Sequence, residues 1–183
     1  MQFEEELILN SGITRPRMGS LTIVLKNCDD VVGVVREYIG ATLAQHLGFN
    51  TPPFFLLWQD GQPLFASTFI PGARYDHDLI TRQPFRSYVL DFDHFIGNPD
   101  RHGGNFLVAD DVIYLIDHER AFQPGFDEAG ECWTGFDEPA EWIRQHVTNI
   151  APSLWVRFEQ EFRHSQDALK EISLLKESFN RVV

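Results

Sequence analysis

Polar side chains of the kind that support metal-assisted phosphoryl transfer follow one another between Asp91 and Phe122. Asp100 lies in a turn rich in Asn, Pro and Gly, the amide Asn105 follows five positions later, and a second acid, Asp117, ends the next apolar run. In such a transfer one carboxylate orients the attacking hydroxyl, while an amide oxygen and a second carboxylate hold magnesium ions on the nucleotide phosphates. The order of acid, amide and acid is therefore what metal-assisted phosphoryl transfer from a nucleotide needs.

Two short apolar runs follow this turn, NFLVA at 105–109 and VIYLI at 112–116, and Asp110–Asp111 joins them. We expect the two runs to form a β-hairpin. Asn105 begins the first strand and Asp117 follows the second, so the hairpin places both side chains at the same end. Two metal ligands twelve positions apart in the sequence can meet in this way.

The chain before this region predicts strands, one of which ends in a lysine. Residues 2–9 alternate loosely between acids and apolar side chains, and a turn signal follows at residues 10–12. The run LTIVLK at 21–26 is β-branched and apolar, and Lys26 closes it. An ammonium at a strand end beside a cleft can contact a nucleotide phosphate. Taken alone, Lys26 also fits an ordinary solvent-facing lysine.

An amphipathic helix is predicted next, from residue 29 or 30 to residue 47. Apolar residues recur there at steps of three and four, and Gly48 follows as a C-cap. Glu37 borders the apolar stripe, where a carboxylate could pair with Lys26 and hold that amine toward the phosphates. For Glu37 taken alone, a solvated helix glutamate is the simpler interpretation.

A hairpin is predicted over residues 53–70. PFFLLW and PLFASTFI are apolar strand runs, and they are joined across Gln59–Gln62, whose Asp-Gly pair favours a tight turn. Pro71–Gly72 ends the second strand, so residues 67–72 become a link to the second half of the chain. Backbone amides and carbonyls in such a link are free to bind the edge of an adenine.

The second half is predicted to be mainly helical. A buried helix is expected at Thr81–Ile96 from its apolar stripe. We expect Asp91 or Asp93, near the end of this helix, to be a buried structural partner for the turn that follows, holding Arg101 or backbone amides.

A loop and three more helices are expected after the hairpin. Residues 122–136 are rich in Gly, Asp and Glu and predict a loop, in which Thr134 is the one conventional hydroxyl for phosphorylation. Apolar residues at helical steps then predict helices at Glu138–Val147, Ser153–Phe162 and Gln166–Phe179.

Composition limits the classes of protein to which the chain can belong. Its 183 residues suffice for one core, or for two small lobes that share a cleft. A formal net charge of −12 argues against a nucleic-acid groove, which needs clustered Lys and Arg. Cys28 and Cys132 lack metal-ligand spacing and form no disulfide framework, so a reducing cytosol is expected. An acidic N-terminus, and no apolar run near the roughly 20 residues of a membrane span, favour a soluble cytoplasmic protein.

The pattern N-x-D-R-H-x-x-N, followed by a strand pair and I-D-H, resembles the catalytic core of HipA-like kinases. It resembles more distantly the phosphatidylinositol 3/4-kinases and the wider protein-kinase-like fold. SGITRP, the strand that ends in Lys26, REYIGATLAQHLGFNTPPF and FIPG are similar to the small lobe of the compact HipA-like group, and the resemblance covers roughly residues 5 to 125. Asp117 is followed by His118–Glu119 in place of Phe-Gly, which fits the lipid-kinase and HipA-like side of the fold better.

The resemblance implies an α+β, two-lobed protein-kinase-like fold. Residues 1–72 would form a small antiparallel β-sheet lobe with one helix, and residues 73–183 a larger, mainly helical lobe that carries a β-hairpin. The activity implied is that of an ATP- and Mg²⁺-dependent kinase, which phosphorylates Ser or Thr hydroxyls of a protein. A regulatory partner such as an antitoxin is also implied.

The resemblance assigns roles to particular residues. Asp100 would be the catalytic carboxylate, and His102 would support the turn and help to stabilise charge on the transferring group. The other implied roles are contact with the phosphates by Lys26, pairing of Lys26 with Glu37, an adenine clamp from the backbone of Thr68, Phe69 and Ile70, and magnesium coordination by Asn105 and Asp117.

Other classes of protein remain open at this stage. A pseudokinase would bind a nucleotide or a partner without turnover, and the acceptor of an active kinase could also be a lipid or a small molecule. A metal-dependent hydrolase would use histidine and carboxylate ligands together, namely His94, His102, His118, Asp93, Asp100 and Asp117. The hydrolase interpretation leaves Lys26 and Glu37 without a function.

Overall fold

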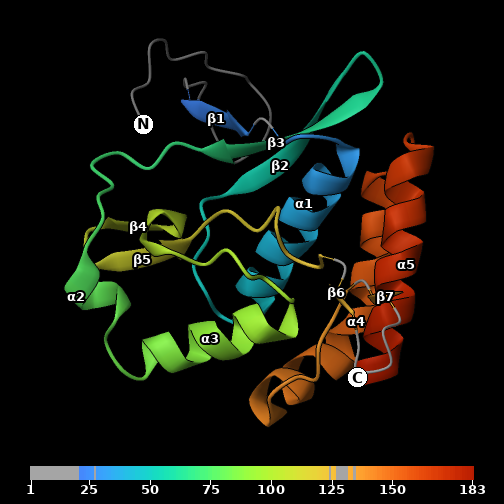
Figure 1. The fold of residues 1–183 in the computed structure, drawn as a ribbon. Coiled ribbons are helices and arrows are strands. Elements are labelled where there is room, and N and C mark those ends of the chain that lie inside the picture. Colours follow the sequence, from blue (N-terminus) through green and yellow to red (C-terminus); the bar gives the residue numbers. More distant parts are fainter. Residues whose placement is uncertain (1–20, 27, 124, 127–131, 134) are drawn as a thin grey trace, which may run out of the picture.

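The computed structural model describes residues 21–26, 28–123, 125–126, 132–133 and 135–183, and it is an α+β structure with small antiparallel sheets (Figure 1). The strand predicted at residues 2–9, the loop SGITRPRMGS and Thr134 lie outside the described residues. The elements are β1 (Ile23–Lys26), α1 (Val31–His46), β2 (Phe54–Gln59), β3 (Gln62–Thr68), α2 (His77–Ile80), α3 (Phe85–Phe95), a 3₁₀ turn (Gly103–Asn105), β4 (Phe106–Ala109), β5 (Val112–Leu115), β6 (Gly125–Phe126), β7 (Cys132–Trp133), α4 (Glu141–Glu161) and α5 (Gln166–Val182).

The largest sheet has the order β1-β3-β2 and is antiparallel throughout. Its β2–β3 hairpin confirms the prediction, since Gln59 pairs with Gln62 across the turn. Asp60 and Gly61 both have positive φ, at 51° and 78°. A two-residue turn of this kind matches the twist of the flanking strands, which is why Asp-Gly is favoured there.

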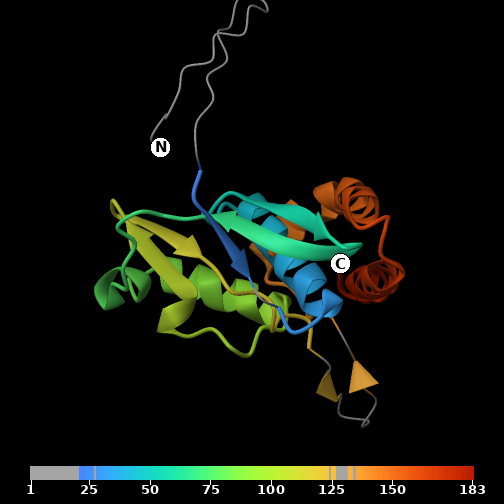
Figure 2. The ribbon, with the colours of Figure 1, turned by 90° about the horizontal axis from the view of Figure 1, so that it is seen from above.

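Helix α1 lies at the centre of the molecule, between the helices α4 and α5 on one side and α3 with the β4–β5 hairpin on the other (Figures 1 and 2). Asp30 caps its start by accepting a hydrogen bond from the amide of Gly33 (2.8 Å). Leu47 is the C-cap of α1, and the predicted helix-ending Gly48 takes the next position, with φ of +87°. α1 contacts β3, α4 and α5, so one helix packs against both the sheet and the carboxyl-terminal helices.

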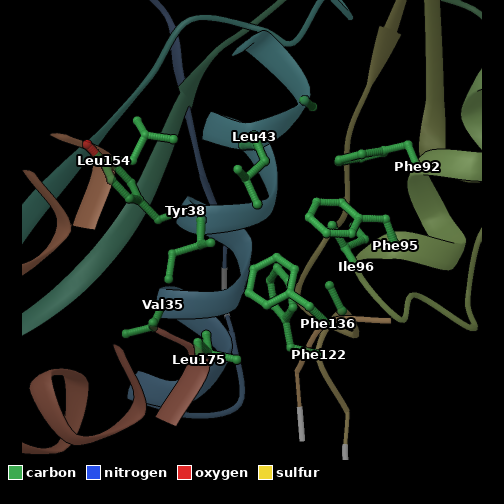
Figure 3. Close-up of a cluster of buried hydrophobic side chains, with 14 of the residues drawn as sticks. Val35, Tyr38, Leu43, Phe92, Phe95, Ile96, Phe122, Phe136, Leu154 and Leu175 are labelled. Atoms are coloured by element: carbon green, nitrogen blue, oxygen red, sulfur yellow. The ribbon is translucent and has the colours of Figure 1, made fainter. Parts of the chain in front are cut away.

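A hydrophobic core surrounds α1 (Figure 3). Phe92, Phe95 and Ile96 reach it from the region of α3, and Leu154 and Leu175 reach it from α4 and α5. All five side chains are buried. In the described part of the chain, no helix has the length and apolarity needed to cross a bilayer.

The helix predicted at Thr81–Ile96 begins later than expected. α2 ends at Ile80 and α3 begins at Phe85, with Pro84 as its N-cap. The prediction was wrong over residues 81–84 because a proline restricts the residue before it to extended conformations and brings no amide donor of its own. The spacing of apolar residues alone does not predict this break in the helix.

The helices predicted at Glu138–Val147 and Ser153–Phe162 are in fact one helix, α4, which continues through Pro152. The predicted bounds rested on apolar residues at helical steps, and the helix continues although a proline removes one hydrogen bond from a helix interior. Burial on both sides of the proline explains the continuity, because Val147 and Leu154 enter the same core. The last predicted helix is confirmed as α5, with Ser165 as its N-cap.

Candidate functional site

A cleft of about 450 Å³ is lined by residues of the three-stranded sheet, α1 and the β4–β5 hairpin. Its walls are largely apolar, with Val24, Phe54 and Phe65 from the sheet and Leu107 and Leu115 from the hairpin. Charged side chains line it as well, namely Lys26, Glu37 and Asp117. A concave, largely apolar volume with a few polar groups is the usual form of a small-molecule site.

Lys26 joins three segments of the chain in this cleft. Its Nζ donates to Glu37 Oε2 at 2.7 Å and to Asp117 Oδ1 at 2.5 Å. Oε2 of Glu119 lies 3.6 Å from the same nitrogen. The structure therefore brings together the predicted residues Lys26, Glu37 and Asp117, although Lys26 and Asp117 are 91 positions apart in the sequence.

The charges of this cluster hold one another in the ionised form. Burial disfavours charge on Lys26, but the carboxylates of Glu37 and Asp117 outweigh burial and raise the pKa of the amine. Burial also opposes ionisation of Glu37, yet its partners His118 and Lys26 lower the pKa of this carboxyl to about 2. Burial raises the pKa of the neighbouring Cys28 thiol to about 12, with Glu37 and Glu119 acting in the same direction, so Cys28 is a neutral thiol and a poor nucleophile.

The β4–β5 hairpin places Asn105 beside Asp117, as predicted. Phe106 pairs with Leu115, and the amide of Ile116 donates to the carbonyl of Asn105 at 3.1 Å. Asn105 is buried, and its Nδ2 donates to the carbonyl of Asp100 at 2.9 Å. This bond fixes the amide plane through its nitrogen and leaves Oδ1, the atom that can coordinate a cation, for another partner.

The backbone at Asp117 adopts the left-handed region, with φ of 66°. Asp tolerates this conformation better than most residues, but it is uncommon away from glycine. It occurs where the chain leaves β5 and where two successive residues contact the cluster, since the side chain of Asp117 meets Lys26 and the amide of His118 donates to Glu37 Oε2 at 2.5 Å. Unusual backbone conformations of this kind concentrate at functional sites.

A buried ion pair holds the turn before Asn105. Nε and Nη2 of Arg101 donate to the carboxylate oxygens of Asp93 at 2.9–3.1 Å. Nη1 of Arg101 donates to the carbonyls of Asn105 (3.3 Å) and Ile116 (2.6 Å). Asp93 is therefore the predicted structural partner of the turn. The other candidate, Asp91, accepts instead from the indole of Trp142 at 2.8 Å.

Asp100 and His102 lie on the exposed surface of this turn and do not line the cleft themselves. The amide of Asp100 donates to Asn98 Oδ1 at 3.3 Å. Nδ1 of His102 accepts from the amide of Gly104 at 3.0 Å, a hydrogen bond within the turn. The carboxylate of Asp100 is thus presented to solvent by a rigid turn.

The end of β3 and the link after it line the cleft with Thr68, Phe69 and Ile70, as expected for a base-binding segment. Two of its amides are already engaged, because Thr68 donates to Pro53 at 2.8 Å and Phe69 donates to Thr22 at 3.0 Å. The hydrogen bonds among the described residues leave the amide of Ile70 free. Ile70 is therefore a donor in this link that a base edge can use.

The side chains proposed for a hydrolase do not assemble. Asp93 is committed to Arg101, His118 is buried, and His94 is exposed with Asp137 3.7 Å away. Across the ranges that the structure describes, no three His, Cys, Asp or Glu side chains are grouped to hold a metal ion. The structure gives no support to that alternative.

Sequence reasoning did not identify two residues of the cluster as functional. The sequence suggested His118 and Glu119 as a replacement for the Phe-Gly pair, and His118 also as a ligand in the hydrolase alternative. Their one signal in the sequence is the occurrence of two more ionisable residues directly after Asp117. Two backbone pairings hold the hairpin, one between Asn50 and Tyr114 and one between Arg74 and Val108. Neither pairing has a signal in the sequence.

A scan against models of known protein families gives no match, and a search of curated proteins finds no significant relative.

Proposed function

We propose that the chain is an ATP- and Mg²⁺-dependent phosphotransferase with a two-lobed protein-kinase-like fold. The proposal takes residues 1–72 as the nucleotide-binding lobe and residues 73–183 as the catalytic lobe. The observation that carries it is the position of Lys26, whose amine bridges Glu37 of α1 and Asp117 of the hairpin on the wall of an apolar cleft. Such a cleft suits a purine, and a fixed ammonium at its edge suits phosphates.

Glu37 and Lys26 act as a unit in this proposal. Glu37 is almost fully buried and keeps its charge. Its carboxylate is therefore shielded from water and fixes the direction of the Lys26 amine. A preorganised cation costs no reorganisation when negative charge develops on the phosphate oxygens. The free amide of Ile70 provides the polar contact for the base in the same cleft.

Asn105 and Asp117 fit the demands of a magnesium ion. Mg²⁺ prefers oxygen ligands and is usually held by one or two protein side chains together with waters and substrate phosphates. Oδ1 of Asn105 and the carboxylate of Asp117 supply such oxygens at one end of the hairpin. When bound, the ion would neutralise charge on the nucleotide phosphates.

Asp100 is the proposed orienting carboxylate for the acceptor. It is exposed, and its position is fixed by hydrogen bonds of its own amide and carbonyl groups. An exposed carboxylate on a rigid turn is accessible to a hydroxyl carried by a large molecule. This accessibility favours the Ser or Thr hydroxyl of a protein as the acceptor.

The test is incubation with γ-labelled ATP and Mg²⁺, with and without a cell lysate. Transfer of label to a lysate protein or to the chain itself is the expected result, and Asp100→Asn should lose it by at least about a hundredfold, in line with the loss of a positioned acid–base group. Release of free phosphate alone would indicate a hydrolase. Binding of nucleotide without any transfer would leave only the nucleotide-binding function and would refute the phosphotransferase.

A further inference from the structure

The imidazole of His118 is fully buried without a hydrogen-bond partner. Its exposed fraction is 0%, and within the described part of the chain neither ring nitrogen has a hydrogen-bond partner. The ring packs edge-on against Phe92, and the residue lines the cleft. Burying polar atoms without partners destabilises the folded state, and an apolar side chain of similar size would avoid that cost. Packing alone therefore does not explain a histidine here.

The position of His118 relative to Glu37 supplies a reason. The backbone amide of His118 donates to Glu37 Oε2, the same oxygen that accepts from Lys26 at 2.7 Å. The ring faces the other oxygen, since Nδ1 lies 3.7 Å from Glu37 Oε1. This distance is slightly longer than a hydrogen bond, so a small shift of the carboxylate closes it. One residue thus faces both oxygens of Glu37.

Helix α1 is shaped to receive this residue. Gly40 lies three positions after Glu37, on the same face of the helix. A Cβ on Gly40 would lie 2.6 Å from Cβ of His118, which is too close for any real side chain. Glu37 and the space at Gly40 together seat His118 against α1. The contact between His118 and Gly40 places the imidazole beside the carboxylate of Glu37.

We propose that His118 is a positioning residue whose imidazole holds Glu37 Oε1, so that Oε2 remains directed at Lys26 when the Asp117 carboxylate coordinates a cation. In the structure Asp117 Oδ1 shares Lys26 with Glu37. A carboxylate that coordinates a cation gives up this contact, and Glu37 then has to orient Lys26 alone. This inference rests on the proposed function. It assigns to His118 a task that its backbone amide cannot perform, namely fixing the second oxygen.

Three variants separate this task from packing. His118→Leu removes the donor and the unpartnered polar atoms, so it should melt at or above the wild-type temperature while Mg-ATP affinity falls about tenfold or more, the loss expected for a hydrogen bond to a charged group. His118→Asn places an amide nitrogen near the position of Nδ1 and should bind within about threefold of wild type. Phe92→Leu alters the ring that packs on His118 and should lower the melting temperature with little change in affinity.

Titration calorimetry with Mg-ATP and thermal melts decide the outcome. Wild-type affinity in His118→Leu, or an equal loss in the Leu and Asn variants, would overturn the role of the imidazole as a donor. If His118→Leu fails to fold, His118→Met replaces it with the same expectations.

A measurement without nucleotide keeps this inference distinct from the proposed function. A double-mutant cycle of His118→Leu and Glu37→Gln in urea unfolding should show coupling between the two side chains. Additive effects in the cycle would overturn the His118–Glu37 interaction whatever the nucleotide result. If the wild type binds no Mg-ATP while the cycle shows coupling, the phosphotransferase fails, and the imidazole is then a structural partner of Glu37 rather than a positioning residue.

Discussion

At the scale of single residues, the charges around Lys26 do not balance. Among the described residues, the carboxylates of Glu37, Asp117 and Glu119 all lie within 4 Å of its Nζ. One ammonium neutralises one of three negative charges, so the cluster as a whole is anionic. Such a cluster would repel a bare triphosphate, and it favours a nucleotide that arrives with a divalent cation. The requirement for Mg²⁺ in the proposed function follows from this balance.

The depressed pKa of Glu37 predicts acid-dependent stability. Its pKa lies at about 2 in the folded chain against an ordinary value of 4.5. As pH falls below 4.5, Glu37 is protonated in the unfolded chain but stays ionised in the folded chain. The stability contributed by the ionised carboxylate is therefore complete above pH 4.5 and is lost as pH falls toward 2. Between pH 5 and 3 this residue should contribute a loss of about 2 kcal/mol.

Urea unfolding at several pH values checks this expectation. Glu37→Gln should have a free energy of unfolding that changes less over this range than that of the wild type. Glu177→Gln, at an exposed position of α5, should follow the wild-type profile. Parallel profiles for Glu37→Gln and wild type would contradict the assignment.

The ion pair between Arg101 and Asp93 should dominate the stability of the turn. Both side chains are only 7% exposed, so removing the arginine leaves a buried carboxylate without its partner. Arg101→Ala is expected to lower the free energy of unfolding by about 3 kcal/mol or more. Lys176→Ala, which breaks the exposed pair with Glu159, should cost less than about 1 kcal/mol. Denaturant unfolding measures both, and similar losses in the two variants would show that burial does not set the strength of these pairs.

At the scale of secondary structure, prediction succeeded where a local signal determines the conformation. The Asp-Gly turn of the β2–β3 hairpin needs positive φ at both residues, and the sequence supplies residues that accept it. Prediction was wrong at the two prolines. Pro84 delays α3 and Pro152 does not interrupt α4, because the outcome depends on how much apolar surface the flanking residues bury in the folded chain.

The contact between α1 and the segment after β5 is a property of the elements that sequence reasoning could not supply. Gly40 carries no mark of its function in the sequence, yet its missing side chain admits His118. Gly40→Ala should favour the isolated helix by up to about 1 kcal/mol, but the overlap with His118 should cost about 1–3 kcal/mol. We expect a net loss of stability together with weaker Mg-ATP binding, because the displaced segment carries Asp117.

Thermal melts and titration calorimetry test this expectation, with Gly33→Ala as the matched variant in the same helix. A Cβ at Gly33 meets Cβ of Cys28 at 3.2 Å, a milder approach than the one at Gly40. Gly33→Ala should therefore bind Mg-ATP as the wild type does. If Gly40→Ala gains stability and binds normally, the close packing of α1 on the Asp117 segment is not required.

At the scale of the whole molecule, the site depends on contacts between distant parts of the chain. The hairpin that carries Asn105 and Asp117 is held by Asn50, which precedes β2, and by Arg74, which follows β3. The polar residues and their order predict a phosphotransferase site. Their convergence could not be derived from the sequence, since it rests on backbone pairing between segments without distinctive residues and on a core that surrounds α1.

A ligand that contacts both walls of the cleft should stabilise the molecule as a whole. Mg-ATP in the proposed site would bind residues of the sheet and of the hairpin at once, so unfolding of either would release it. At about 100 times its dissociation constant, the ligand should add about 2.7 kcal/mol. For a chain of this length that corresponds to a rise in melting temperature of roughly 5–10 °C.

Asp117→Ala should show no rise with Mg-ATP, because the cation loses its carboxylate ligand, whereas Asp100→Asn should respond as the wild type does. An equal rise in Asp117→Ala and wild type would mean that the nucleotide, if bound, does not use the hairpin.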